Sequence, residues 1–164
     1  MKISGITGWK NTGKTGLVER LVTEISARGF SVSTVKHAHH SFDVDHEGRD
    51  SYRHREAGAR EVLLSSGNRW ALMHELRGAP EVPLADLLAK LTPVDLVLVE
   101  GFKAEGHNKI ECHRAATGKD ILAKKDSSIV ALASDTQVDL EQPVFDLNDT
   151  TAIADFVLGQ VGLK

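Results

Sequence analysis

Apolar and polar positions over the first thirty-six residues follow two different periods. Lys2–Thr7 contains two isoleucines and predicts a short strand. After Thr15, apolar side chains recur at helical spacing: Leu17, Val18, Leu21, Val22 and Ile25. Gly29 is suited to end that helix, and Ser31–Lys36 predicts a second strand. Strand, helix and strand in this order predict a right-handed βαβ unit with parallel strands.

The rest of the chain continues this alternation. The near-continuous apolar run Val94–Val99 is typical of a central parallel strand covered on both faces, and Ser128–Ser134 follows the same pattern. Helices are predicted in "PLADLLAKL" and in "TTAIADFVLGQV". Between them, two apolar stretches flank Ser65–Asn68, as in a β-hairpin. We therefore expect a three-layer α/β fold with a mostly parallel sheet and an added antiparallel β-hairpin.

The loop between the first strand and the first helix has the pattern G-x-x-x-x-G-K-[ST], beginning at Gly8. Such a loop cradles phosphates with backbone N–H groups and the N-terminus of the helix that follows. Lys14 is expected to neutralise β- and γ-phosphate oxygens, and the Thr15 hydroxyl to ligate Mg²⁺. We thus predict one P-loop NTPase-like, nucleotide-binding domain over residues 1–164. With Gly8, its expected phosphate-binding residues are Lys10, Asn11, Thr12, Gly13, Lys14 and Thr15.

A magnesium site of this kind needs a carboxylate at the C-terminal end of a buried strand, where α/β sheets bind ligands. Glu100 follows the run Val94–Val99 directly, whereas Asp95 lies at its beginning, on the wrong edge. We assign Glu100 to the metal side, either directly or through water. The alternative is a solvated loop glutamate.

The segment Lys36–Ser51 concentrates histidines and aspartates immediately after the second strand. In a P-loop protein this is the place of a γ-phosphate-sensing switch or a substrate-binding loop. In that interpretation Asp43 or Asp45 orders Mg²⁺ or an attacking water, and Asp45 joins Lys14 and Glu100 as a candidate catalytic residue. Two alternatives stay open. One is a solvated polar loop, and the other is a transition-metal site built on four histidines: His37, His39, His40 and His46.

Base preference depends on weaker features. The string Asn108–Glu111 is close to the guanine-binding pattern N-K-x-D, but it follows Glu100 without room for a helix and ends in glutamate, so we reject it. Asp135 follows the strand predicted at Ser128–Ser134. Its carboxylate could accept hydrogen bonds from guanine, or it could cap a turn.

Composition narrows the function classes. With 164 residues, 41% hydrophobic and 26% charged, the chain has the size and composition of one globular domain. A net charge of -3 gives no general attraction to nucleic acid or anionic membranes. No apolar run reaches the ~18 residues of a membrane span, and the single cysteine, Cys112, agrees with a reducing compartment. We expect a cytoplasmic protein without nucleic-acid or membrane partners.

The segments "GWKNTGKT", "KHAHHSFDVDHEGRDS", "VLVEGFK" and "KIECHR" together resemble the molybdopterin-guanine dinucleotide biosynthesis adaptor family, MobB, in the order expected for it. The resemblance spans Met1 to about Asp135. It implies a homodimeric P-loop protein that binds GTP with Mg²⁺ and hydrolyses it slowly. The implied partners are the guanylyltransferase that joins GMP to molybdopterin in molybdenum cofactor biosynthesis, and molybdopterin itself.

One position favours slow hydrolysis. Dimeric P-loop ATPases that activate one another across an interface place a lysine directly after the first glycine of the loop, where this chain has Trp9, with Lys10 one residue later. Without a cation on the developing charge, hydrolysis is slower by ~10³ to 10⁵-fold. The alternatives to an accessory GTPase are a metallochaperone GTPase that uses the histidines and a small-molecule kinase. The hairpin around Trp70 is the expected dimer contact.

Overall fold

The computed structural model describes residues 1–38 and 42–164. Contacts within the chain divide it into two compact units. The first contains residues Met1–His37 and Leu87–Lys164, and the second contains Ala38–Asp86. The single domain expected over residues 1–164 stays a prediction.

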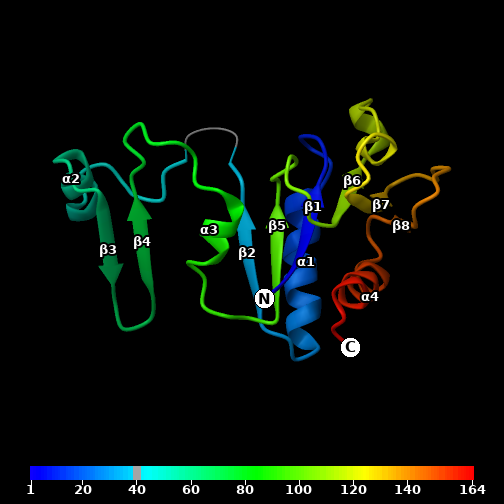
Figure 1. The fold of residues 1–164 in the computed structure, drawn as a ribbon, viewed down its shortest axis with the longest axis horizontal. Helices are drawn as coiled ribbons and strands as arrows, with labels where there is room; N and C mark the ends of the chain where they lie inside the picture. The colour runs from blue at the N-terminus through cyan, green and yellow to red at the C-terminus, as the bar shows by residue number, and fades with distance from the viewer. Residues whose placement is uncertain (39–41) are drawn as a thin grey trace. The chain divides into compact units, whose positions relative to one another are not determined.

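A six-stranded sheet forms the centre of the first unit, in the order β2-β5-β1-β6-β7-β8, and every neighbouring pair is parallel (Figure 1). Its strands are β1 (Lys2–Thr7), β2 (Val32–Lys36), β5 (Leu96–Glu100), β6 (Lys109–His113), β7 (Ile129–Ser134) and β8 (Val144–Asp146). The chain leaves the adjacent central strands β1 and β5 toward opposite edges of the sheet, from β1 to β2 and from β5 to β6. The loops after these two strands therefore meet at the carboxyl edge, where ligands bind in open α/β sheets.

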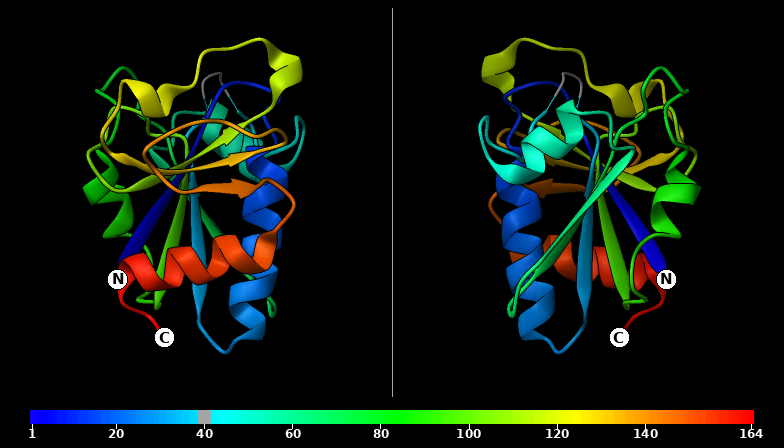
Figure 2. Two further views of the ribbon diagram at one scale, coloured as in Figure 1. Left: turned by 90° about the vertical axis from the view of Figure 1, so that its right-hand side faces the viewer. Right: turned by 90° about the vertical axis from the view of Figure 1, so that its left-hand side faces the viewer.

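Two helices, α1 (Lys14–Ala27) and α4 (Thr150–Val161), pack against each other on one face of this sheet (Figure 2). Both helices contribute fully buried side chains to one core with alternate residues of the strands: Leu17, Leu21 and Ile25 from α1, and Ile153 and Val157 from α4. Gly29, with φ 92°, follows the end of α1 as expected. The 3₁₀ turns Ala115–Thr117 and Leu122–Lys124 follow β6.

The second unit contains α2 (Asp50–Glu56) and a β-hairpin of β3 (Glu61–Ser65) and β4 (Trp70–His74). The short helix α3 (Leu84–Leu88) lies at the boundary with the first unit. Of the residues described in the second unit, only three are buried: Ser51, Val62 and Leu84. The second unit therefore has very little core of its own.

The predicted fold class is confirmed: a mostly parallel sheet with helices and an antiparallel hairpin. The strand β6 was not predicted, because Lys109, Glu111 and His113 alternate with its apolar residues and suggest a solvated face. All five residues of β6 are buried. Glu111 accepts hydrogen bonds from the backbone N–H groups of the turn Leu122–Lys124, and Lys109 donates to Ser128 Oγ, so the polar face of the strand is satisfied internally.

Candidate nucleotide site

The P-loop connects β1 to α1 and requires glycine where the sequence has it. Gly8 has φ 134°, and a Cβ there would lie 2.4 Å from the carbonyl oxygen of Cys112. Gly13, with φ 94°, precedes α1, and no side chain caps the N-terminus of that helix. The first backbone N–H groups of α1 therefore lack a side-chain acceptor and are available to an anion.

Trp9 stabilises the loop before this N-terminus through hydrogen bonds of its backbone carbonyl and its indole. Its carbonyl oxygen accepts a hydrogen bond from Thr12 Oγ1, and its indole Nε1 donates to the carbonyl of Asp120 at 2.8 Å. The ammonium groups of Lys103 and Lys119 lie 4.6 and 5.9 Å from the centre of the indole ring. The residue after the first glycine therefore ties the P-loop to the segment that follows β6.

Lys14 is folded back onto its own loop, because its Nζ donates to the Trp9 carbonyl at 2.6 Å. Burial lowers the pKa of Lys14, as do the neighbouring charges of Lys103 and Lys36, while Cys112 and Glu100 act in the opposite direction. Lys14, Lys36 and Lys103 thus lie close enough to interact, and together they make a cationic site for an anionic ligand.

Thr15 and Glu100 come together across the ends of β1 and β5. Thr15 Oγ1 donates to Glu100 Oε1 at 3.2 Å, and the Glu100 residue is only 8% exposed. Lys36 Nζ lies 3.4 Å from each of these two oxygens. Hydroxyl and carboxylate oxygens suit Mg²⁺, and a cationic group already lies beside both, so the residues present fit this ion. The alternative of a solvated loop glutamate does not agree with this burial.

A hollow opens in front of the loop and contains one residue that the sequence analysis did not select, Arg114. The hollow is lined by Asn11, Gly13, Lys14, Thr15, Gly16 and Arg114. Arg114 follows β6 directly, and its guanidinium lies beside Gly13. Finding it from the sequence required the recognition of β6 and of its place next to β1.

Asp135 follows β7, as predicted, and has the turn-capping role that the sequence analysis left open. Its Oδ1 accepts the backbone N–H of Ala115 at 2.9 Å, at the start of the 3₁₀ turn after β6. Nearby, His113 Nδ1 and Ser134 Oγ are 3.0 Å apart and buried. Contact between Asp135 and a guanine base stays a prediction.

The segment Lys36–Ser51 divides between the two units. In the first unit, the His37 ring lies against the Phe102 ring, with centroids 4.8 Å apart, while its backbone N–H donates to the Glu100 carbonyl. In the second unit, Asp45 Oδ1 accepts from Ser51 Oγ at 2.7 Å and orders the turn before α2. Within the described part of the chain, Asp45 Oδ2 is buried without a hydrogen-bond partner.

The proposed transition-metal site has no support in the described residues. His39 and His40 lie outside them, and within residues 1–38 and 42–164 no three histidine, cysteine, aspartate or glutamate side chains form a group that could hold a metal ion. The arginines near α2 are partly structural: Arg55 pairs with Asp43 at 2.8 Å and with Glu75 at 3.6 Å. The arginine-rich segment is therefore tied to its own unit, which does not favour a kinase lid.

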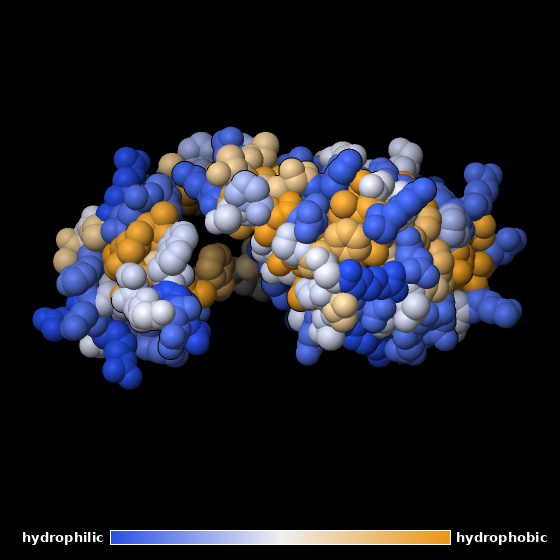
Figure 3. Space-filling model, turned by 90° about the horizontal axis from the view of Figure 1, so that it is seen from below, coloured by the Kyte–Doolittle hydropathy of each residue, from blue (hydrophilic) through white to orange (hydrophobic). Residues whose placement is uncertain are grey.

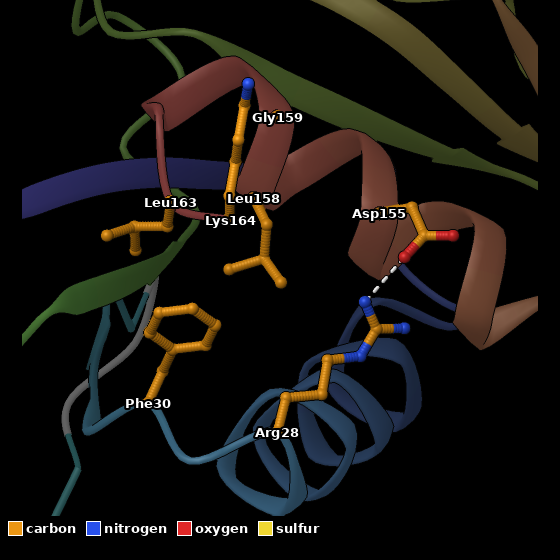
Figure 4. Close-up of a pocket in the computed structure, with 7 residues that line it drawn as sticks. All are labelled: Arg28, Phe30, Asp155, Leu158, Gly159, Leu163 and Lys164. Atoms are coloured by element: carbon orange, nitrogen blue, oxygen red, sulfur yellow. Dashed lines mark hydrogen bonds and ion pairs between the residues drawn. The ribbon is translucent and has the colours of Figure 1, made fainter.

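A second hollow lies at the other end of α1 and has a structural explanation (Figure 4). Figure 4 shows the side chains of Phe30, Leu158 and Leu163 gathered on one side of it, with Arg28 reaching toward Asp155. The Arg28–Asp155 ion pair measures 2.5 Å, and Arg28 also pairs with Glu24. This hollow marks the contact between the ends of α1 and α4.

No helix in the described part of the chain combines the length and the apolar character that crossing a membrane requires.

Comparisons with known proteins agree with one another. Residues 3–135 match the family model described as molybdopterin guanine dinucleotide synthesis protein B, MobB. Relatives named molybdopterin-guanine dinucleotide biosynthesis adapter protein are 42% identical in Haemophilus influenzae, over 93% of this chain and 85% of the relative, and 39% identical in Escherichia coli, over 92% and 87%. The crystal structure of a MobB homologue from Bacillus stearothermophilus superimposes with a TM-score of 0.74 at 27% identity, covering 99% of both chains.

Proposed function

The chain belongs to the MobB family, and from this membership we propose that it is a GTP-binding adapter that assists the attachment of GMP to molybdopterin in molybdopterin guanine dinucleotide biosynthesis. The observation that carries the nucleotide part of the proposal is the contact between Thr15 and Glu100 at the mouth of a complete P-loop. That contact places a hydroxyl and a carboxylate beside the uncapped N-terminus of α1.

In the proposed complex, the backbone N–H groups from Lys10 to Thr15 bind the β-phosphate, and Lys14 leaves the Trp9 carbonyl to bind β- and γ-phosphate oxygens. Thr15 and Glu100 hold Mg²⁺, which neutralises charge on the phosphates when bound. Arg114, which also lines the hollow, adds its guanidinium to the lysines around the loop.

Hydrolysis is proposed to be slow. Trp9 occupies the position after Gly8, where P-loop ATPases that activate one another have a lysine. Its indole N–H donates a hydrogen bond to the chain's own Asp120 carbonyl. Lys14 and Glu100 remain the candidate catalytic residues at the loop, and the catalytic role expected for Asp45, a residue of the second unit, stays a prediction. Because slow turnover favours a long-lived complex with GTP, it agrees with an accessory role beside a partner nucleotidyltransferase.

Guanine preference is proposed to depend on Asp135. This carboxylate lies at the carboxyl end of β7, two strands from β1, and holds the 3₁₀ turn that begins at Ala115. A carboxylate can accept hydrogen bonds from both N1–H and the amino group of guanine, whereas adenine has no N1–H.

We further propose that the chain forms a homodimer through the hairpin of β3 and β4. Leu63 and Leu72 face each other across this hairpin, and they are 61% and 44% exposed. Trp70, on the same face as Leu72, is 64% exposed. Figure 3 shows hydrophobic residues at the surface of the unit that carries this hairpin. A second copy would cover this apolar face, which has few buried neighbours within its own unit.

Calorimetric titration tests the nucleotide part of the proposal. The purified protein is titrated with a non-hydrolysable GTP analogue and with its ATP counterpart, each with and without Mg²⁺. We expect binding that requires Mg²⁺ and prefers guanine. Failure to bind either analogue would remove the nucleotide function, while preference for adenine would favour a small-molecule kinase.

Capture experiments test the adapter part separately. The purified molybdopterin guanylyltransferase is immobilised, and retention of this chain is measured with the GTP analogue, with GDP and without nucleotide. Retention in at least one state is expected. Absence of retention in all three, with nucleotide binding intact, would leave a GTP-binding protein without the proposed partner.

A further inference from the structure

Lys36, the last residue of β2, holds the position beside Glu100 that the candidate magnesium site requires. The parallel register of β2 and β5 pairs Lys36 directly with Glu100. The side chain follows this pairing: Lys36 Nζ lies 3.4 Å from Glu100 Oε1 and 3.4 Å from Thr15 Oγ1. All three residues belong to the first unit.

The Glu100 and Lys36 side chains differ in their exposure to solvent. The Glu100 side chain is 11% exposed and fixed at the end of a central strand, whereas the Lys36 side chain is 57% exposed. A nearly buried carboxylate needs a counter-charge, and among the described residues Lys36 forms the ion pair with Glu100. The lysine is therefore the partner that can leave when another cation needs the same oxygens.

On the premise of the proposed GTP function, we propose that Lys36 is the resident counter-cation of Glu100 and that it moves to the terminal phosphate when a magnesium nucleotide binds. Lys36 and the metal need the same Glu100 and Thr15 oxygens, so Lys36 opposes metal binding. The γ-phosphate offers the displaced ammonium a new anionic partner. GDP lacks the γ-phosphate, and the loop N–H groups and Lys14 already bind its β-phosphate, so Lys36 would make the chain distinguish GTP from GDP.

This exchange predicts two opposite effects when the charge of Lys36 is removed. The protein should bind Mg²⁺ more readily, and it should distinguish GTP from GDP less well. Lys36→Met keeps most of the aliphatic chain and loses the ammonium. The Mg²⁺ concentration for half-maximal binding of GDP should then fall, because the competing cation is gone. The ratio of GTP-analogue affinity to GDP affinity should fall by about tenfold, the value of one charge-assisted hydrogen bond. A merely structural role for Lys36 would weaken both nucleotides alike.

Lys36→Arg and Lys103→Met are the matched variants. Lys36→Arg keeps the charge and should retain the GTP-to-GDP ratio within about twofold, which is small against the tenfold expected for the methionine variant. Lys103→Met removes a lysine that acts on Lys14 but makes no ion pair with Glu100 among the described contacts, so it should weaken both nucleotides without lowering the Mg²⁺ requirement.

Calorimetry with GDP and the non-hydrolysable GTP analogue, over a series of Mg²⁺ concentrations, decides the proposal. A lower Mg²⁺ requirement together with a lower GTP-to-GDP ratio in Lys36→Met supports it. An unchanged ratio, or a raised Mg²⁺ requirement, overturns it while wild-type binding of GTP stands. If the wild type binds neither nucleotide, the proposed function fails first, and that outcome is visible before any variant is compared.

Discussion

The hydroxyl of Thr15 lies 3.2 Å from a carboxylate oxygen of Glu100, although 85 positions separate them in the sequence. The contact exists because β1 and β5 are parallel neighbours, so that the loops after both strands meet at one edge of the sheet.

Glu100→Gln should remove most of the Mg²⁺ dependence of nucleotide binding. The amide keeps the shape of the side chain but loses the charge that suits a divalent cation. We expect the gain in GTP-analogue affinity on adding Mg²⁺ to fall by at least about tenfold in calorimetry. Asp95→Asn is the matched control, since Asp95 lies at the other end of β5 and bonds Ser31. An equal loss in both variants would contradict the assignment.

Lys14→Ala should reduce nucleotide affinity by about ten- to a hundredfold while the fold stays intact. The lysine is only half-buried and bonds a loop carbonyl, so its loss leaves no core cavity. Lys10→Ala provides the comparison, because alanine retains the backbone N–H that Lys10 is expected to contribute. Unchanged affinity for the GTP analogue in Lys14→Ala, with normal circular dichroism, would refute the site.

Gly8→Ala should destabilise the protein by about 3 kcal/mol or more, because it combines a positive φ with a clash against backbone. The added Cβ would lie 2.4 Å from the Cys112 carbonyl oxygen. Gly16→Ala is the control: Gly16 lies in α1, and a Cβ added there would lie 3.6 Å from an Arg20 nitrogen, an ordinary van der Waals contact. That change should cost nothing and stabilise by up to about 1 kcal/mol. Urea unfolding of both variants measures the difference.

Cys112 should be inert to thiol reagents in the folded protein at pH 8 and react fully in denaturant. It is completely buried, and burial raises the pKa of its thiol to about 12. The thiol of the unfolded chain has an ordinary pKa of 9.0, so the thiol's contribution to stability is complete below that pH and is lost as the pH rises toward 12.

Comparison with Cys112→Ala isolates this effect from the titration of lysines. The free energy of unfolding of the wild type should decline more steeply between about pH 8.5 and 10 than that of the variant. Parallel curves, or rapid modification of the native thiol, would show that the interior around β6 is accessible to solvent.

Trp70→Ser and Leu72→Ser should each weaken self-association, raising the dissociation constant by about thirtyfold or more if either residue is a hot spot. Light scattering after size-exclusion chromatography gives the mass at several concentrations. Val144→Ser is the control, since Val144 is also an exposed apolar residue, at 36%, but lies in β8. A wild type that is monomeric at every concentration would refute the proposed dimer.

The elements around the phosphate loop could be predicted from the sequence because their signals are local. The strand Lys2–Thr7 and the helix Thr150–Val161 have the predicted bounds, and Glu100 lies where the apolar run before it ends. Those signals depend on hydrophobic periodicity and on the glycines of the loop. Both can be recognised in the sequence without knowing which residues lie nearby in the folded chain.

Lys36 and Arg114 could not be assigned in the same way. The partner of Lys36 is decided by the order of strands in the sheet, which places β5 between β1 and β2. Arg114 follows a strand with polar residues at alternate positions, and those residues are satisfied by distant backbone groups such as the N–H of Leu122. Such partners are tertiary, so no local pattern indicates them.

The two tryptophans give this chain an independent optical signal for each of its two proposed events. Trp9 lies in the phosphate loop close to the ammonium groups of Lys103 and Lys119, so that movement of either ammonium alters the charge around its indole. Trp70, on the exposed face of the hairpin, would lose contact with water when a second copy covers it. Trp70→Phe isolates the emission of Trp9, and Trp9→Phe isolates that of Trp70. With these two variants, fluorescence follows nucleotide loading and association separately and without a label.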